Sequence, residues 1–256
     1  MYNKARKRHK DENMTESEFR SELTRVFKLN GLGSYLSLER SEKLFRLTEI
    51  LLEENEKYNL TAIKEPKKII LNHYLDCAMP LSRIKKGATL IDVGCGAGFP
   101  TLPFAIFRED LKILAIDSTE KRVEYVKRCA EELGLSGVSA RAMRAEDGAL
   151  TEELRESFDY ATARAVANLR VLSELCIPYV KPGGEFLAMK GKNAEFELKE
   201  AKSAIAILGG RDAKIELIKI SDGEISEEHP LVIIKKGQKT PKQYPRPYAK
   251  ISKKPL

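Results

Sequence analysis

Apolar residues recur every three or four positions through the first third of the chain, as in helices that bury one face. The stretch 38–58 fits this pattern, and its apolar members are Leu44, Phe45, Leu47, Leu51, Leu52 and Tyr58. Thr15-Glu16-Ser17-Glu18 fits a capping box and predicts the start of an earlier helix. Pro66 suits the first turn of a third helix, on which Ile69, Ile70, His73 and Cys77 share one face. Residues 14–82 are therefore expected to form a helical segment.

The pattern changes after residue 82. Compact apolar runs now alternate with helical stretches, and the runs are ATLIDVG (88–94), KILAID (112–117), GVSARAMRAED (137–147), FDYATARAV (158–166) and GEFLAMKG (184–191). This alternation predicts a parallel sheet covered by helices on both faces. KIELIKIS (214–221) and HPLVIIKKG (229–237) follow with no helix between them, so we expect an antiparallel pair at one edge. Together they predict a mostly parallel, seven-stranded α/β sheet over 83–237, preceded by the helical segment.

Length and composition limit the possible size and class of the protein. The 256 residues suffice for one large domain, or for one domain with an appendage. No apolar run reaches the ~18 residues of a membrane span, and no apolar region suited to a secretion signal follows the basic start. The four cysteines lie far apart without a C-x-x-C pair, which indicates neither a metal site nor a disulfide framework. We therefore expect a cytoplasmic protein with reduced thiols and no membrane association.

The net charge of +7 is unevenly distributed. Residues 4–10 carry five Lys and Arg and residues 235–256 carry eight, with no acidic residue in either stretch. The other 32 of the 45 basic residues are outnumbered by 38 acidic ones. Basic ends on an acidic body indicate a polyanionic partner such as nucleic acid, although solvated, disordered tails would look the same. We expect 1–13 to be a disordered leader and 238–256 to be a basic, Pro-rich tail.

The stretch LIDVGCGAGFP (90–100) places Gly94, Gly96 and Gly98 between the first strand and a helix, where open parallel sheets bind their ligands. The spacing G-x-G-x-G lacks the third glycine of a dinucleotide fingerprint, because Phe99 stands there, and no G-K-[ST] follows as in a P-loop. Asp117 ends the second strand, where a carboxylate can bind both ribose hydroxyls. A nucleoside site without a phosphate site favours S-adenosylmethionine and a class I, Rossmann-like methyltransferase fold.

Other strand ends supply further candidate contacts. Asp92 could face the ammonium group of the cofactor, and Ala145-Glu146 could meet its adenine edge, although Glu146 could instead cap a helix starting near Ala149. Arg164 ends the fourth strand and faces the expected site of methyl transfer, unless it is a structural ion-pair partner.

The chain resembles the bacterial small-subunit ribosomal RNA guanine-N7 methyltransferase family, RsmG, formerly called glucose-inhibited division protein B. The matching segments are YNLTAI (58–63), HYLDCA (73–78), DVGCGAGFPTLPFAI (92–106), DSTEKR (117–122), RAED (144–147), TARAVANL (162–169), KPGGEFLAMKG (181–191), HPLVIIKK (229–236) and TPKQYPR (240–246). They cover nearly everything after residue 14. The departures are small: Cys95 stands where Ser or Thr is usual, Cys77 where Ser is usual, and Thr101 where Gly is usual.

The resemblance implies methylation of N7 of one guanine in a loop of 16S rRNA, with naked rRNA or the 30S subunit as partner. It implies cofactor contacts at Gly94, Phe99, Ala145, Glu146 and Arg164, with Asp117 at the ribose. With the rest of the glycine loop and the residue after Asp117, the expected cofactor site comprises Gly94, Gly96, Gly98, Phe99, Asp117, Ser118, Ala145, Glu146 and Arg164.

Guanine N7 carries a lone pair and needs no general base, so we assign no catalytic residue and expect no metal. Candidate substrate-binding residues are Arg164, Lys190 and Arg246. His73 is expected to be an interior histidine paired with Asp76 rather than a base. Tyr244 and Tyr248 could stack on unpaired bases or fold back onto the sheet. The rival functions are a methyltransferase for another RNA, a protein or a small molecule, and a non-catalytic RNA-binding protein. We expect a monomer.

Overall fold

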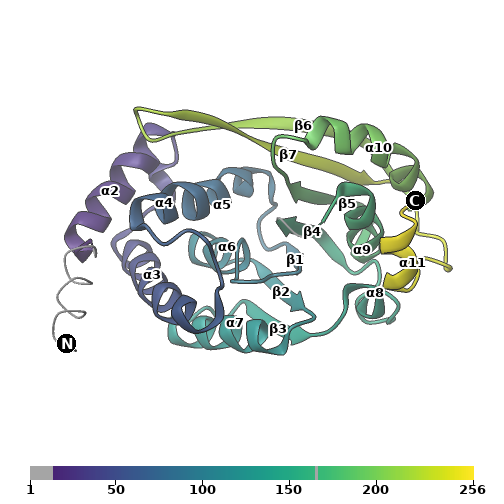
Figure 1. The fold of residues 1–256 in the computed structure, drawn as a ribbon, viewed down its shortest axis with the longest axis horizontal. Coiled ribbons are helices and arrows are strands. Elements are labelled where there is room, and N and C mark those ends of the chain that lie inside the picture. Colours follow the sequence, from purple (N-terminus) through teal and green to yellow (C-terminus); the bar gives the residue numbers. More distant parts are fainter. Residues whose placement is uncertain (1–13, 165–166) are drawn as a thin grey trace.

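The computed structural model describes residues 14–164 and 167–256, so the expected leader at 1–13 lies outside the described residues. The N-terminal helices form as the sequence predicts (Figure 1). α2 (Glu16–Leu29) starts at a capping box, in which Thr15 and Glu18 satisfy each other's backbone amides. α3 spans Leu38–Tyr58. α4 (Pro66–Ile69), with its proline in the first turn, continues through a π-helical segment (Ile70–Leu75) into α5 (Asp76–Ala78).

Seven strands form one sheet in the order β3-β2-β1-β4-β5-β7-β6. β1 (Thr89–Val93) pairs in parallel with β2 (Lys112–Asp117) and β4 (Phe158–Arg164). β3 (Val138–Ala142) and β5 (Val180–Met189) extend the parallel part on either side. β6 (Gly210–Ser221) and β7 (Ser226–Lys236) complete the sheet as an antiparallel pair. The fold class predicted from the alternation of apolar runs is confirmed.

Neighbouring residues of the central strands alternate between two hydrophobic cores because successive strand side chains point to opposite faces. Leu90 and Ile113 join one core, which contains α2, α3, α6 (Thr101–Phe107) and α7 (Glu120–Glu132). Ile91 and Leu114 join the other, beneath α9 (Leu169–Cys176) and α10 (Ala194–Ile207). The two layers of helices leave the carboxyl ends of the parallel strands accessible.

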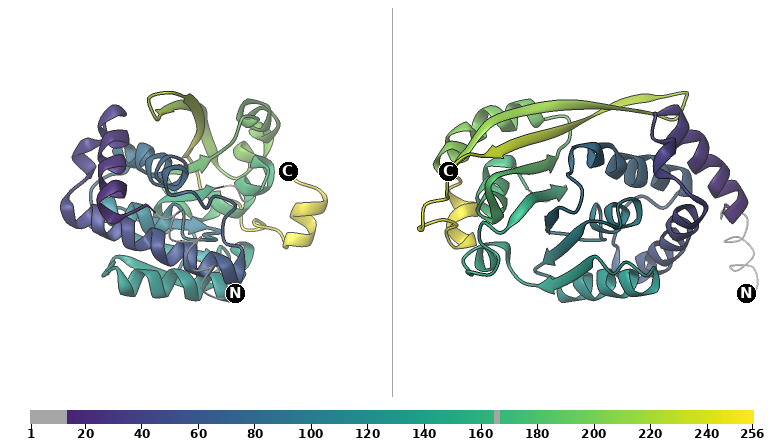
Figure 2. Two further views of the ribbon diagram at one scale, coloured as in Figure 1. Left: turned by 60° about the vertical axis from the view of Figure 1, so that its left-hand side comes forward. Right: turned by 180° about the vertical axis from the view of Figure 1, so that it is seen from behind.

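The β6–β7 hairpin is long enough to reach the N-terminal helices (Figure 2). Asn30, at the end of α2, donates from Nδ2 to the carbonyl oxygen of Ser221 at 2.7 Å and accepts from its amide at 2.9 Å. Arg25 donates to the carbonyl oxygen of Asp222. The helical segment is thus held to the far edge of the sheet as well as packed on its core.

The C-terminal segment is more ordered than the description of 238–256 as a basic, Pro-rich tail suggested. It contains α11 (Tyr248–Lys253), whose Ile251 is fully buried in the core beneath α9. Tyr244 also packs against this core, which confirms the alternative that it folds back. Arg246, one of the residues that suggested a solvated tail, instead contacts the body at Glu174, whereas Lys250, Lys253 and Lys254 are exposed. Among the described residues, no helix is long and apolar enough to cross a membrane.

Candidate functional site

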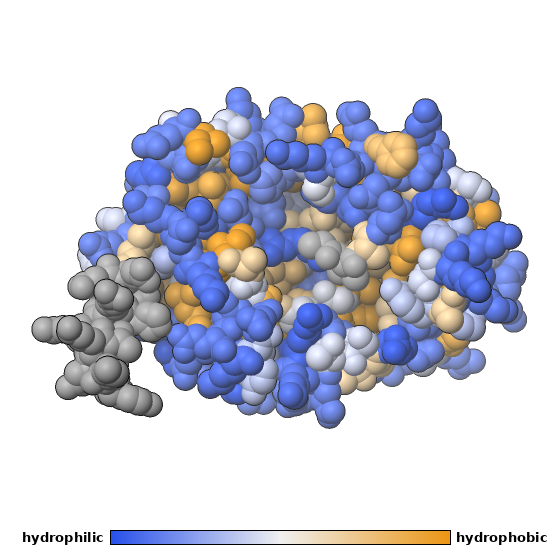
Figure 3. Space-filling model, in the orientation of Figure 1, coloured by the Kyte–Doolittle hydropathy of each residue, from blue (hydrophilic) through white to orange (hydrophobic). Residues whose placement is uncertain are grey.

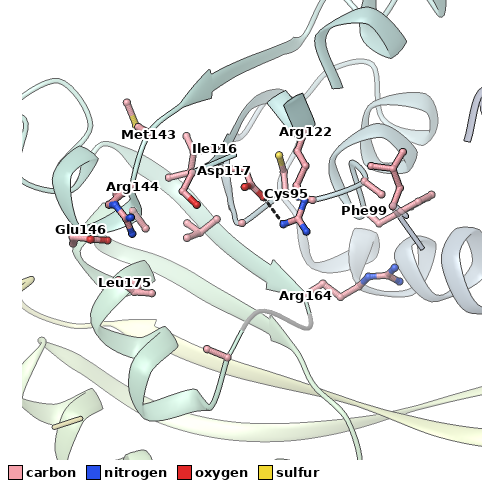
Figure 4. A pocket seen from close by; sticks show the side chains of 18 of the residues that line it. Cys95, Phe99, Ile116, Asp117, Arg122, Met143, Arg144, Glu146, Arg164 and Leu175 are labelled. Atoms are coloured by element: carbon pink, nitrogen blue, oxygen red, sulfur yellow. Dashed lines mark hydrogen bonds and ion pairs between the residues drawn. The ribbon is translucent and has the colours of Figure 1, made fainter. Parts of the chain in front are cut away.

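A cavity of about 450 Å³ lies at the carboxyl ends of β1, β2, β3 and β4. Figure 3 shows this face as mostly hydrophilic with a hollowed centre in which hydrophobic side chains are visible. Figure 4 shows the lining side chains, which come from elements far apart in the chain. Of the expected cofactor-site residues, the structure brings eight together around the cavity: Gly94, Gly96, Phe99, Asp117, Ser118, Ala145, Glu146 and Arg164.

The glycine loop uses its backbone amides within the protein. The amides of Gly94 and Cys95 both donate to the carbonyl oxygen of Ile116, at 2.8 and 3.0 Å. Gly96 donates its amide to Oδ2 of Asp117 at 3.1 Å. A phosphate-binding loop directs such amides at the ligand instead. The loop therefore suits a ligand without a phosphate group, as its sequence suggested.

Gly98 serves packing rather than ligand contact. Its φ is +80°, and a Cβ atom there would lie 2.5 Å from Cδ1 of Leu102. Unlike Gly94 and Gly96, it does not line the cavity. Gly98 is thus required for close packing at the start of α6. It does not line the cavity, where the sequence had led us to expect it.

Asp117 presents a nearly buried carboxylate to the cavity at the end of β2. Its Oδ1 accepts the amide of Thr119 at 2.9 Å, and Arg122 lies 3.5 Å from Oδ2. Figure 4 shows this pair on the wall of the cavity. A carboxylate fixed by two backbone amides keeps lone pairs with which to accept further hydrogen bonds, as the hydroxyl groups of a ribose require.

Asp92 does not face the cavity, which corrects the expectation that it meets a ligand ammonium group. Its side chain is fully buried, and its Oδ2 accepts the hydroxyl of Thr101 at 2.6 Å. Burial raises the pKa of this carboxyl group to about 6. Asp92 and Thr101 therefore join β1 to α6 beneath the loop. The spacing of Asp92 to the glycines was visible in sequence, but the direction of its side chain was not.

The Met143–Glu146 stretch forms the far end of the cavity, after β3. α8 (Ala145–Gly148) begins at Ala145 rather than near Ala149, so the alternative role of Glu146 as a cap there is wrong. Glu146 is nearly buried, and Tyr179 donates its hydroxyl to the carbonyl oxygen of Ala145 at 2.6 Å. This end therefore offers a nearly buried carboxylate together with apolar side chains from Met143 and Leu175 (Figure 4).

Three side chains meet at the opposite end. The ring of His73 stacks on Phe99 with their centroids 4.3 Å apart, and the Arg164 guanidinium lies 5.4 Å from the same ring. Arg164 is 2.8 Å from Nδ1 of His73 and also donates to the carbonyl oxygen of Asn72. Arginine only donates, so Nδ1 of His73 accepts from it, and the proton of the neutral ring resides on Nε2, which lies 3.2 Å from Oγ1 of Thr61. The carbonyl oxygen of Asn72 also lies 3.1 Å from Nδ1, and in this tautomer its hydrogen bond comes from Arg164 instead. Burial and the nearby Arg164 charge lower the pKa of His73 to about 4.

His73 is interior as expected, but its expected partner is wrong. Asp76 instead accepts from Arg164 at 3.1 Å and from Nδ1 of His229 at 2.8 Å. The hydrogen bond with Asp76 raises the pKa of His229. Asp76 therefore joins the ends of β4 and β7, and Arg164 is both a cavity residue and an ion-pair partner. The ion-pair alternative for Arg164 is confirmed, and its contact with a bound cofactor or substrate stays a prediction.

Lys190 and Arg246, two of the candidate substrate-binding residues, do not line this cavity. Lys190 is nearly buried in an ion pair with Glu197 at 2.8 Å and borders a neighbouring cavity of about 310 Å³ that also contains Arg164 and His229. Arg246 binds the fully buried carboxylate of Glu174 at 2.6 Å. Its charge is neutralised inside the protein because burying a carboxylate requires a paired cation.

Several lining residues were missed in the sequence. Thr61 lies within the segment YNLTAI, whose resemblance was noted without assigning the residue a contact. Leu175 and Tyr248 come from α9 and α11, and only their packing brings them to the cavity. Arg122 lies one helical turn beyond Ser118, and Met143 lies two positions before Ala145.

Comparisons with known proteins show the family to which the chain is similar. The family model described as rRNA small subunit methyltransferase G matches residues 40–226. The ribosomal RNA small subunit methyltransferase G of Clostridium perfringens (strain 13 / Type A) is 45% identical over 229 residues, covering 89% of this chain and 95% of the relative. The protein of that name from Clostridium botulinum (strain Eklund 17B / Type B) is 47% identical over 227 residues, covering 88% of this chain and 94% of the relative.

Solved structures share the fold at low sequence identity. The tRNA (m1A58) methyltransferase of Aquifex aeolicus aligns with a TM-score of 0.50 and 17% identity, covering 75% of this chain and 76% of that one. A predicted O-methyltransferase of Agrobacterium tumefaciens aligns with a TM-score of 0.50 and 16% identity, covering 64% of this chain and 83% of that one.

Proposed function

Since this chain belongs to the rRNA small subunit methyltransferase G family, and is thus a ribosomal RNA methyltransferase, we propose that it methylates N7 of a guanine in 16S rRNA. S-adenosylmethionine is the proposed cofactor, and it supplies an activated methyl group on a positively charged sulfur. The relatives' names support the ribosomal RNA substrate. The geometry of the cavity supports the cofactor and the target atom.

The cavity fits a phosphate-free nucleoside with an amino-acid tail. Its volume of about 450 Å³ falls in the usual range for small-ligand sites. Asp117 would accept the ribose hydroxyls, and the carboxylate of Glu146 with the backbone of Ala145 would meet the adenine edge. The nucleoside would lie along Gly94, Gly96 and Ser118. The amino-acid tail of the cofactor would extend towards Phe99 and Arg164. The engaged loop amides argue against a dinucleotide in the same place.

The observation that favours N7 over an exocyclic amine is the state of His73. An amine must lose a proton when it is methylated, whereas N7 attacks with a lone pair that is already available. The unprotonated Nδ1 of His73 already accepts from Arg164, so this histidine is not available as a base. The chain's own residues then act by holding the guanine and the methyl donor in line, and positioning of this kind lowers a barrier by several kcal/mol.

We propose that residues 83–237 form the catalytic domain, on which 14–82 pack as a helical segment and 238–256 as a basic tail. For a ribosomal substrate we propose a monomeric enzyme that acts in the cytoplasm. The choice between naked 16S rRNA and the 30S subunit is decided by the same assay that tests the function.

The test is transfer of labelled methyl groups to 30S subunits, to naked 16S rRNA, and to protein and small-molecule pools. The modified nucleotide is then mapped by chemical cleavage at N7-methylguanine. We expect label in 16S rRNA at one cleavable guanine. Product that resists this cleavage would overturn the N7 assignment, and label confined to another pool would overturn the RNA substrate. A protein that binds 16S rRNA but transfers no label would be the non-catalytic alternative.

A further inference from the structure

The C-terminal segment is attached to the body by polar groups that are largely shielded from water. Arg155 donates to the carbonyl oxygens of Thr240 and Tyr244, at 2.9 and 2.8 Å. Lys236, which is fully buried, donates to the hydroxyl of Thr240 and to the carbonyl oxygen of Ile177. Contacts of this kind fix the course of the backbone before α11 begins.

The next anchors bring the segment to the cavity. Arg246 binds Glu174 through both its backbone amide and its guanidinium group. Glu174 precedes Leu175, which lines the cavity, and Arg246 lies two residues before Tyr248, which also lines it. Ile251 is buried beneath α9, and Arg170 at the start of α9 donates to the carbonyl oxygens of Pro255 and Leu256. Tyr248 is thus held between anchors on both sides.

Tyr248 stands at the Glu146 end of the cavity. α11 packs against α9, and α9 in turn contacts α8 (Figure 1). Tyr179, which follows α9, donates its hydroxyl to Ala145, so the carboxyl end of α9 adjoins the α8 end of the cavity. The opposite end is occupied by the stacked rings of His73 and Phe99. The side chain of Tyr248 remains 42% exposed, although it sits on an anchored backbone.

We propose that Tyr248 covers the adenine of the bound cofactor by stacking its ring on the base. This inference rests on the proposed function, since it assumes that S-adenosylmethionine occupies the cavity with its adenine towards Glu146. An exposed aromatic ring on a fixed backbone loses little conformational freedom when a flat partner binds to it. Adenine supplies such a partner, and stacking on it would bury the apolar face of the tyrosine ring. The basic C-terminal segment is then part of the cofactor site.

Affinity provides the first test. S-adenosylhomocysteine is titrated by calorimetry into the full-length wild type, Tyr248→Ala and Tyr248→Phe. We expect Tyr248→Ala to weaken binding roughly 5- to 150-fold, the usual effect of removing an aromatic ring that stacks on a base. Tyr248→Phe keeps the ring and should stay within about 2-fold of the wild type. Lys250→Ala, an exposed neighbour on α11, should bind as the wild type does.

Fluorescence provides a second, direct test because the chain contains no tryptophan. Tyr248→Trp creates a single tryptophan at the site, which can be excited selectively over the tyrosines, and Phe196→Trp creates one on the exposed surface of α10 as a control. We expect adenosine and S-adenosylhomocysteine to quench the emission of Tyr248→Trp, methionine to leave it unchanged, and all three to leave Phe196→Trp unchanged.

The possible failures are distinguishable. If the wild type binds S-adenosylhomocysteine, but Tyr248→Ala binds equally well and Tyr248→Trp shows no quenching, the stacking is wrong and the proposed function stands. Quenching by 16S rRNA but not by adenosine would assign Tyr248 to the RNA and overturn the inference. A wild type that binds no S-adenosylhomocysteine would overturn the proposed cofactor and the inference together.

Discussion

Arg164 determines the charge and the hydrogen bonding of several residues of the site. It donates to His73, pairs with Asp76 and lies over Phe99, so its one positive charge sets the tautomer of the histidine and neutralises the carboxylate. Burial opposes protonation of His73 most strongly and the Arg164 charge adds to it, so the pKa of that ring falls to about 4. His73 is therefore neutral throughout the physiological range and contributes to the site through packing.

This state of His73 predicts a methylation rate that is nearly independent of pH. In single-turnover transfer to 30S subunits, we expect a flat profile across pH 6 to 8, because His73 has already lost its proton below that range. His73→Asn should lower the rate less than Arg164→Ala, and thermal melting should confirm that both variants are folded. A rate limb of unit slope that disappears in His73→Asn would contradict the assignment.

Asp117 is the residue whose removal should affect the cofactor most directly. We expect Asp117→Ala to weaken S-adenosylhomocysteine binding by about 1.5–3 kcal/mol, the usual value for hydrogen bonds to a charged group. Asp147→Ala removes an exposed carboxylate that does not line the cavity and should leave the affinity unchanged. Calorimetry measures both variants, and an unaltered dissociation constant for Asp117→Ala would remove this carboxylate from the ribose site.

At the scale of elements, apolar periodicity was sufficient to predict most helices and strands. α3 was predicted with its observed bounds, and the antiparallel edge pair follows from two apolar runs with no helix between them. Periodicity does not report side-chain direction or polar contacts between distant elements. Hence it gave no sign that Asp92 turns inward to Thr101, or that the β6–β7 hairpin extends as far as α2.

The contact between α2 and the hairpin should contribute measurably to stability. Asn30→Ala removes both hydrogen bonds to Ser221, so we expect the free energy of unfolding to fall by about 1–3 kcal/mol. Lys28→Ala, at an exposed position of the same helix, should change it by less than about 0.5 kcal/mol. Urea unfolding measures the free energy of unfolding of both variants. If Asn30→Ala were as stable as the wild type, water would replace these hydrogen bonds without loss of stability.

At the scale of the whole molecule, the two basic ends suggested nucleic acid but could not show which charges remain available. Arg246 looked like an RNA-binding residue, yet it pairs with Glu174, which lies 72 positions earlier in the chain. A count of charges cannot reveal such a pair, because its partner is close only after folding. The lysines of α11 and those beside it remain exposed.

Those lysines should account for part of the salt dependence of RNA binding. Replacing Lys250, Lys253 and Lys254 by Gln should weaken binding to 16S rRNA and make the log–log salt slope shallower, by up to about 0.7 for each phosphate that is no longer neutralised. Replacing the exposed Lys127, Lys199 and Lys202 by Gln changes the net charge equally and serves as control. Equal slopes in the two triple variants would show that α11 binds no phosphate specifically.

The hydrogen bonds between α2 and the hairpin also constrain the order of folding. Asn30 and Ser221 are 191 positions apart, and ribosomes add about 5–20 residues per second, so roughly 10–40 s separate the synthesis of the two partners. The apolar side of α2 can pack before the hairpin is synthesised, because Phe19, Leu23 and Phe27 share a core with α3 and the π-helical segment. During translation the N-terminal helices should therefore collapse early through apolar contacts, and the hairpin should fasten them only after the sheet has formed.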